Sequence, residues 1–179
     1  MQAKHDLAGW GLPPDLLKYQ SQLSDLTVMA PISSFGWLSA KRLDTLSITS
    51  ASLRAIEGLR GSLKTLNLSN SHIENLFGIE KLTALTTLDL SGTVHLKNLS
   101  GIEKLKALTT LYLSSNDLEN LSGIEKLDKL ESLDLSDCKV TTLRPISGLK
   151  HLKTLNLKGT KIQSLKGLPA SVTKLTLGD

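Results

Sequence analysis

Residues 99–105 and 121–127 have the same sequence, LSGIEKL, and residues 76–82 read LFGIEKL. The two identical copies start 22 residues apart, and the third copy starts 23 residues before the first of them. A segment that recurs at a nearly fixed interval indicates a chain built from repeated structural units, which must be recognised before other features are interpreted. The sequence is therefore organised around a repeat of about 22 residues.

Leucine and isoleucine recur at fixed positions around these heptapeptides. If Leu63 is counted as position 1 of a repeat, apolar residues follow at positions 4, 6, 11, 14, 17 and 20, and Ser71 occupies position 9. The repeat that begins at Leu130 follows this pattern without a departure. Repeats begin at residues 23, 43, 63, 85, 108, 130, 152 and 172, so the sequence predicts eight strands.

The spacing of the apolar residues predicts the path of the chain within each repeat. Positions 4 and 6 alternate with polar residues, as on a half-buried strand. Positions 11 to 20 follow a three-residue step, which suits a tight helical turn. Because every repeat runs in the same direction, neighbouring strands must be parallel. Because no repeat can bury its apolar face alone, the repeats must stack on one another.

The repeat pattern, written LxxLxLxx(N/C/T)xLxxLxxIxxL, resembles the signature of leucine-rich-repeat proteins. It is most similar to the short-repeat subclass found in internalins and in phosphatase-regulating leucine-rich-repeat proteins. The resemblance covers residues 23–179, and the nearly identical central repeats are typical of bacterial repeat proteins. It implies an α/β fold, a right-handed solenoid with about eight parallel strands on its concave face and short 3-10 or extended arms on its convex face. It also implies protein binding, although no binding residues can be carried over from either group.

Residues 1–22 do not fit the repeat and are expected to form an N-terminal cap, with residues 23–179 as the repeat domain. Pro13 and Pro14 suit the start of a short helix. Leu16, Leu17, Tyr19 and Leu23 would form its apolar side and, with Trp10, cover the open end of the first repeat; the alternative is a disordered tail. No usual signal peptide and no membrane-spanning stretch is recognisable, which favours a cytoplasmic protein or one exported by another route.

Two departures from the pattern are expected to have local consequences. In the first repeat, Ile32, Phe35 and Leu38 are out of register with the later repeats. One residue is inserted at residues 93–95, where a bulge at the rim of the sheet is expected, as a surface irregularity or a contact point. At the C-terminal edge, Leu175 and Leu177 lie on the last strand. We expect this open end to be covered by further sequence of the natural protein or by a second molecule docked end to end.

No catalytic constellation is recognisable. His5, His72, His95 and His151 occupy unrelated positions, none at metal-ligand spacing from another histidine or from a cysteine. The single cysteine, Cys138, occupies position 9, which indicates a buried and inert thiol. The glycines of the GIEKL segments recur at the turns of the repeat and do not form a glycine-rich phosphate-binding loop. The sequence therefore predicts no enzyme activity, no metal and no cofactor.

The residues at positions 3, 5 and 7 should project from the strands onto the concave face. Most are threonine or serine, and Tyr112 is the one typical interface anchor among them. The predicted partner-binding surface is the central part of this face. Its residues are Thr87, Asp89, Thr110, Tyr112, Ser132, Asp134, Asn156 and Lys158.

Charge is distributed unevenly along the chain. Residues 74–137 carry 6 basic and 11 acidic residues, whereas residues 138–178 carry 8 basic residues and no acidic one. This asymmetry favours a partner with an acidic surface; the alternative is that the lysines protect a sticky terminal edge. On the convex side, Glu80, Glu103 and Glu125 align beside a column of lysines, as expected for a solvated face.

These observations predict a non-enzymatic protein–protein interaction module that binds its partner on the concave face. Neither nucleic acid nor a small-molecule substrate is expected as its ligand. One alternative is the substrate-recognition part of a larger, effector-type enzyme such as a ubiquitin ligase, because Leu168-Pro169 resembles the Leu-Pro repeats of bacterial effectors. Another alternative is a structural spacer. Function must in any case be argued from the site, because one repeat fold hosts many roles.

Overall fold

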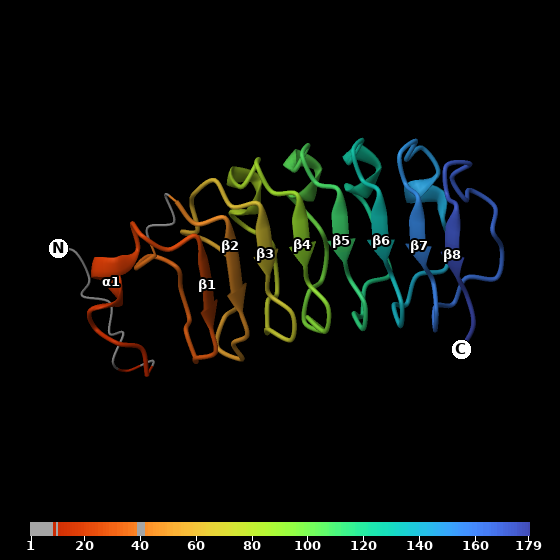
Figure 1. Ribbon diagram of the computed structural model, residues 1–179. Coiled ribbons are helices and arrows are strands. Elements are labelled where there is room, and N and C mark those ends of the chain that lie inside the picture. Colours follow the sequence, from red (N-terminus) through yellow and green to blue (C-terminus); the bar gives the residue numbers. More distant parts are fainter. Residues whose placement is uncertain (1–8, 10, 39–41) are drawn as a thin grey trace.

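The computed structural model describes residues 9, 11–38 and 42–179, which form a solenoid around one eight-stranded sheet (Figure 1). Every strand pairs in parallel with the next one in the chain, in the order β1 to β8. The strands are β1 Asp25–Val28, β2 Thr45–Ile48, β3 Thr65–Asn67, β4 Thr87–Asp89, β5 Thr110–Tyr112, β6 Ser132–Asp134, β7 Thr154–Asn156 and β8 Lys174–Thr176. The predicted eight-stranded parallel sheet is confirmed.

Register places equivalent positions of successive repeats opposite one another. Leu111, at position 4 of its repeat, pairs with Leu88 on one side and with Leu133 on the other. All three leucines are buried, whereas Thr87 and Asp89, which flank Leu88, are half-buried. Side chains alternate between the two sides of a strand. The leucines therefore face the core, and positions 3 and 5 face outward.

In their described parts, the return arms contain four short 3-10 turns, as the three-residue step predicts. They are η2 Ile79–Lys81, η3 Ile102–Lys104, η4 Ile124–Lys126 and η5 Arg144–Ile146. The isoleucine of each turn is buried against the core. In Figure 1 the turns follow one another along the upper side of the solenoid, so the strands and the arms enclose the core between them.

The first repeat reaches the same core by a different route. Ile32 and Phe35 are fully buried, and Leu38 is 7% exposed, although these residues do not match the positions of the later repeats. Trp37 is also buried, and its ring nitrogen donates a hydrogen bond to the carbonyl of Ser34 at 2.8 Å. Larger side chains thus fill the volume that a regular leucine arm fills elsewhere.

One short α-helix occurs among the described residues: α1, Leu16–Tyr19, follows Pro13 and Pro14 as predicted. Leu12, Leu16 and Leu23 pack against the core and are partly buried. The Nε2 of Gln20 donates a hydrogen bond to the carbonyl of Trp37 at 3.1 Å. The assignment of Leu17 and Tyr19 to the apolar side was wrong, because these side chains are 44% and 49% exposed. Trp10 lies outside the described residues, and the domain boundary at residue 22 stays a prediction.

The GIEKL segments are stabilised by hydrogen bonds that the sequence pattern did not reveal. A carboxylate oxygen of Glu103 accepts a hydrogen bond from the backbone N–H of Gly101 at 2.9 Å, and Glu125 accepts one from Gly123 at 2.7 Å. Glu80 does the same for Gly78. These glutamates do not simply form a solvated face. Each satisfies a backbone donor at the start of its 3-10 turn, where hydrogen-bond donors lack partners within the turn.

The glycine of this segment is required by both backbone conformation and packing. Gly123 has φ 100°, and a Cβ atom added to it would lie 3.0 Å from Cγ2 of Ile102 in the preceding repeat. Residues other than glycine are strained at positive φ. Gly148 offers a contrast, because its φ is not positive and a Cβ there would meet nothing within 4 Å.

We expect Gly123→Ala to lower the free energy of unfolding by about 1–3 kcal/mol, through backbone strain and the contact with Ile102. Gly148→Ala is the matched control and should change it by less than about 0.5 kcal/mol. Urea denaturation followed by circular dichroism measures both values. Equal effects of the two substitutions would show that this turn tolerates a side chain.

Candidate functional site

The outward-facing residues of β1 to β8 form a continuous surface, here called the strand face. Across its centre, register aligns Asp89, Tyr112, Asp134 and Asn156 in one row. A second row contains Thr87, Thr110, Ser132 and Thr154. Lys158 follows two residues after the end of β7. The fold thus brings the sequence-predicted residues onto four adjacent strands, which lie about 4.8 Å apart in a sheet.

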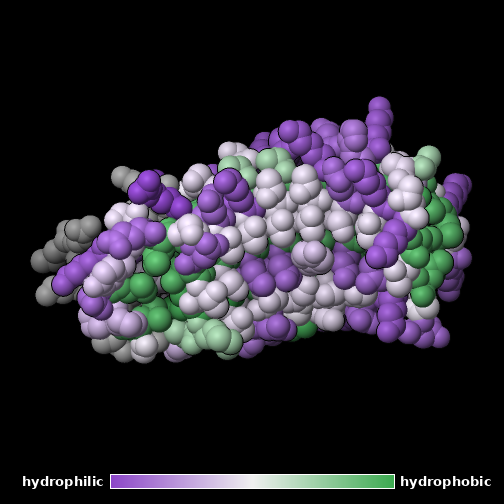
Figure 2. Space-filling view, in the orientation of Figure 1, coloured by the Kyte–Doolittle hydropathy of each residue, from purple (hydrophilic) through white to green (hydrophobic). Residues whose placement is uncertain are grey.

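Tyr112 is the most accessible of the residues in the first row. Its side chain is 38% exposed, whereas Asp89 and Asp134 on either side are half-buried. The side chains of the second row are short, and Figure 2 shows a largely hydrophilic or neutral surface over the middle strands. A phenol in this position offers an apolar ring and a hydrogen-bonding hydroxyl to an approaching molecule.

The polar neighbours of Tyr112 have a structural role that the apolar repeat pattern does not indicate. Oδ1 of Asp89 accepts a hydrogen bond from the backbone N–H of Ser91 at 2.9 Å. Oδ1 of Asp134 accepts hydrogen bonds from the N–H and the hydroxyl of Ser136, at 2.9 and 2.7 Å. Asn156 accepts one from the N–H of Lys158 at 3.1 Å. An Asp or Asn two residues before the bonded N–H is the signal for such Asx turns.

Tyr112 is the exception in a row of turn-forming residues. Asn67, in the same row on β3, also accepts a hydrogen bond from the N–H two residues later, at 2.8 Å. Among the five strands from β3 to β7, four therefore carry an Asx turn at this position, and the fifth carries Tyr112. Since a tyrosine cannot replace this hydrogen bond, the turn does not explain why a large aromatic residue stands here.

Behind the strand face, position 9 forms a buried polar ladder. Ser71, Thr93, Asn116 and Cys138 are all 2% exposed or less. Nδ2 of Asn116 donates hydrogen bonds to the carbonyls of Leu90 and Leu113, at 2.9 and 2.8 Å. Sγ of Cys138 lies 3.0 Å from the same carbonyl of Leu113. The ladder satisfies backbone carbonyls where the chain turns away from the strand.

The thiol of Cys138 belongs to this ladder and has an unreactive environment. Burial raises its pKa to about 11, because the charged thiolate is poorly solvated. At pH 8 only about one thiol in a thousand is then deprotonated, and the thiolate is the reactive form.

We expect iodoacetamide to modify Cys138 at least about 100-fold more slowly in the native protein than in the urea-unfolded chain. Mass spectrometry of timed, acid-quenched samples at pH 8 gives both rates. Raising the pH toward 10 should increase the native rate, because the thiolate fraction grows up to the folded pKa of about 11. Similar rates in the folded and unfolded chain would contradict the burial of this residue.

His72 and His95 meet although their sequence spacing suggested no relation. Their ring centroids are 4.9 Å apart in an edge-to-face arrangement. The inserted residue near Thr93 is accommodated in an extra turn, which leaves Val94 48% exposed and His95 exposed. Among the described residues, no group of three or more His, Cys, Asp or Glu is arranged to hold a metal ion. His5 lies outside the described residues.

Ion pairs join neighbouring repeats at exposed positions. Lys139 lies 2.9 Å from Asp117, and Lys153 lies 2.9 Å from Glu131. The hydrogen bond from Lys153 holds the pKa of Glu131 below its usual value. Within the described parts of the chain, five lysines of the basic C-terminal segment form no ion pair: Lys150, Lys158, Lys161, Lys166 and Lys174. Their charges are therefore not neutralised by any described residue.

Over the same described residues, no helix has the length and the apolar character that a membrane span requires.

Comparison with known proteins identifies the repeats. A family model for "Leucine Rich repeats (2 copies)" matches residues 85–126 and again residues 128–170. No curated protein matches the sequence significantly. These two matches cover the repeats that carry β4 to β7 and all eight predicted binding residues.

Solved structures with the same fold extend the similarity over most of the chain. An internalin (InlF) from Listeria monocytogenes is 18% identical with a TM-score of 0.68, over 91% of this chain and 56% of that one. A leucine-rich-repeat protein from Leptospira interrogans is 24% identical with a TM-score of 0.62, over 92% of this chain and 51% of that one. Human trophoblast glycoprotein is 21% identical with a TM-score of 0.68, over 88% of this chain and 69% of that one. This chain thus spans about half the length of the first and second of these structures.

The family match, the parallel sheet and the internalin-like fold agree with one another: residues 85–170 consist of leucine-rich repeats, and the solenoid as a whole has the fold of leucine-rich-repeat proteins.

Proposed function

We propose that this protein is a non-enzymatic interaction module that binds a partner protein on the strand face, around Tyr112. The exposure of Tyr112 in a row otherwise occupied by turn-forming Asp and Asn residues is the observation that supports this proposal. Tyrosine is enriched among the residues that dominate binding energy at protein interfaces. The leucine-rich-repeat fold, shared with the internalin and with trophoblast glycoprotein, is consistent with protein binding.

The neighbours of Tyr112 suggest how a partner would be recognised. One oxygen of Asp89 and one of Asp134 are fixed by the turn, so each carboxylate is held in a defined orientation beside the phenol. Ordered polar groups lose little conformational entropy on binding. The partner would place an apolar group on the Tyr112 ring and hydrogen-bond donors near the two carboxylates, and its acidic groups would face Lys158.

We expect Tyr112→Ala to weaken partner binding by about 1 kcal/mol or more, roughly fivefold, while leaving the free energy of unfolding nearly unchanged. Immobilised wild type and variant are compared in lysates of the source organism by quantitative mass spectrometry. Phe77→Ala is the control, because Phe77 is 62% exposed but lies beside η2 in the return arm. If the Tyr112→Ala variant retains the partners, the binding site does not lie at Tyr112. If no specific partner is found, a structural spacer is favoured.

A further inference from the structure

The repeat that begins at Leu85 has 23 residues, one more than each of the next two repeats. The extra residue lies between Thr93 and Leu96. The N–H of Leu96 donates a hydrogen bond to the carbonyl of Thr93 at 2.9 Å, which closes a tight turn with Val94 and His95 at its tip. Both of these residues are exposed, whereas Leu96 is 2% exposed. The insertion therefore adds a side chain to the surface, and Leu96 still reaches the core.

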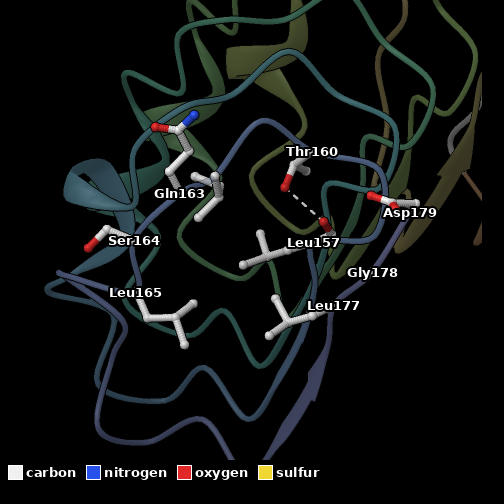
Figure 3. Close-up of a pocket in the computed structure, with 9 residues that line it drawn as sticks. Leu157, Thr160, Gln163, Ser164, Leu165, Leu177, Gly178 and Asp179 are labelled. Atoms are coloured by element: carbon white, nitrogen blue, oxygen red, sulfur yellow. Dashed lines mark hydrogen bonds between the residues drawn. The ribbon is translucent and has the colours of Figure 1, made fainter.

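The turn before the insertion forms in the same way in a repeat that lacks the extra residue. The hydroxyl and the N–H of Thr93 both donate to the carbonyl of Leu90, at 2.6 and 3.3 Å. Thr160, at the same position of its repeat, makes the same two hydrogen bonds to the carbonyl of Leu157, at 2.7 and 3.2 Å. Figure 3 shows the bond from the hydroxyl of Thr160. The backbone of this turn therefore does not require the extra residue.

The extra residue brings His95 against His72 of the preceding repeat. The centroids of the two imidazole rings are 4.9 Å apart, and the ring planes are inclined by 71°. No ring nitrogen of either histidine is hydrogen-bonded to a described residue. His72 is half-buried and His95 is exposed, so solvent reaches both rings. Each ring, when neutral, therefore offers a nitrogen lone pair to a ligand from solution.

The spacing of the two rings suits a shared metal ion. An imidazole nitrogen binds Zn²⁺ at about 2.0–2.1 Å, so two rings that each bind one ion through one nitrogen have centroids about 5 Å apart. The observed separation of 4.9 Å is close to this value. Because no hydrogen bond to a described residue fixes either ring, both rings are free to turn a nitrogen toward a common point.

The neighbouring carboxylates are engaged elsewhere. Asp117 occupies the position in its repeat that His72 occupies in its own, and its carboxylate is paired with Lys139 at 2.9 Å. Glu74, two residues after His72, lies 3.7 Å from Arg54. This agrees with the absence of any three-residue metal cluster among the described residues. Two imidazoles would hold the ion, and its other coordination positions would be filled by water or by another molecule.

From these observations we infer that His72 and His95 form a surface site for a transition-metal ion. Imidazole is a good ligand for Zn²⁺, Ni²⁺ and Cu²⁺, whereas Mg²⁺ and Ca²⁺ prefer oxygen ligands. The ion joins the repeat of residues 63–84 to that of residues 85–107, and its open positions accept a ligand from a partner molecule. This site is separate from the Tyr112 surface and does not depend on the proposed function.

Isothermal titration calorimetry of the full, untagged chain with Cu²⁺, Zn²⁺ or Mg²⁺ tests the inference. We expect Cu²⁺ to bind more tightly than Zn²⁺, and Mg²⁺ not to bind. His72→Gln and His95→Gln should each weaken Cu²⁺ and Zn²⁺ binding at least about tenfold, since even the outer-shell partners of metal ligands contribute that much. His151→Gln is the matched control, because His151 is an exposed histidine outside the pair, and it should leave the affinity unchanged.

A second measurement locates the ion without relying on the affinity of the variants. In nuclear magnetic resonance spectra of the wild-type chain, substoichiometric Cu²⁺ should broaden the Cε1–H signals of His72 and His95 before those of His5 and His151. Each signal is assigned by its loss in the corresponding His→Gln variant, and circular dichroism checks that the variants keep the fold.

Three results would overturn the inference. They are binding of both Cu²⁺ and Zn²⁺ weaker than about 1 mM, an affinity unchanged in His72→Gln or His95→Gln, and equal broadening of all four histidine signals. The two rings would then form an edge-to-face contact only.

Discussion

Leu111→Ala is expected to lower the free energy of unfolding by about 2–5 kcal/mol, the range found when a fully buried leucine is truncated. Leu111 is 0% exposed and stands in the middle of the sheet, between Leu88 and Leu133. The cavity would be lined by residues of three repeats. In a solenoid, stability is a sum over neighbouring interfaces, so this one substitution weakens the contacts with both neighbours.

The control is Leu175→Ala, the same position in the last repeat. Leu175 is half-buried and has a neighbouring strand on only one side, β7. We expect a loss of stability less than half that of Leu111→Ala, as urea denaturation followed by far-ultraviolet circular dichroism will measure. A similar loss for both variants would mean that the last repeat is covered in solution by something that the solenoid itself does not supply.

Asn116→Ala is expected to cost about 2–3 kcal/mol of unfolding free energy. Each buried polar group left without a partner costs about 1–3 kcal/mol, and the deleted side chain also leaves a cavity. The amide of Asn116 is shared between repeats: it donates to Leu90 in the preceding repeat and to Leu113 in its own, and its Oδ1 lies 2.9 Å from the hydroxyl of Thr93. Its removal therefore weakens the polar ladder between these two repeats.

Asn120→Ala provides the matched control within the same repeat. Asn120 also accepts hydrogen bonds, from the N–H and the hydroxyl of Ser122, but it is exposed, and water can replace them. Its substitution should lower the free energy of unfolding by less than about 1 kcal/mol. If Asn116→Ala and Asn120→Ala have equal effects under urea denaturation, the buried ladder is not a major source of stability.

The fold could be predicted from sequence because one pattern specifies it many times over. Leucines such as Leu88, Leu111 and Leu133 occur at the same position in each repeat, so strand number, direction and register follow from the period alone. The first repeat shows the limit of this reasoning. Phe35 is fully buried there without matching the pattern, because packing selects volume and shape and not sequence position.

Side-chain hydrogen bonds were the least predictable part of the structure. The turn made by Asp89, the bond from Gly123 to Glu125 and the contact of His72 with His95 depend on local geometry that apolar periodicity does not describe. An Asp or Asn followed by serine two residues later would have indicated the first of these. The second resembles the way in which an acidic residue in the first helical turn bonds back to the cap.

The candidate site was predictable in position but not in detail. Alternation along a strand places Tyr112 and Asp134 on the outer face, and register places them side by side. The sequence did not reveal that Asp134 is held by Ser136, which reduces the number of residues free to engage a partner. Tyr112 therefore has a larger share in the proposed interface than the residue list alone would suggest.

Photo-crosslinking from position 112 tests most directly whether the strand face binds a protein. Tyr112 is replaced by p-benzoylphenylalanine, a second chain carries the same residue at position 77, and both are irradiated in a lysate of the source organism. Tyr112 lies on the strand face, whereas Phe77 is exposed in a return arm, so only the first probe faces the proposed partner. We predict a discrete covalent adduct from position 112 that is absent from position 77. Equal adducts from both positions, or an adduct from position 77 alone, would contradict binding on the strand face.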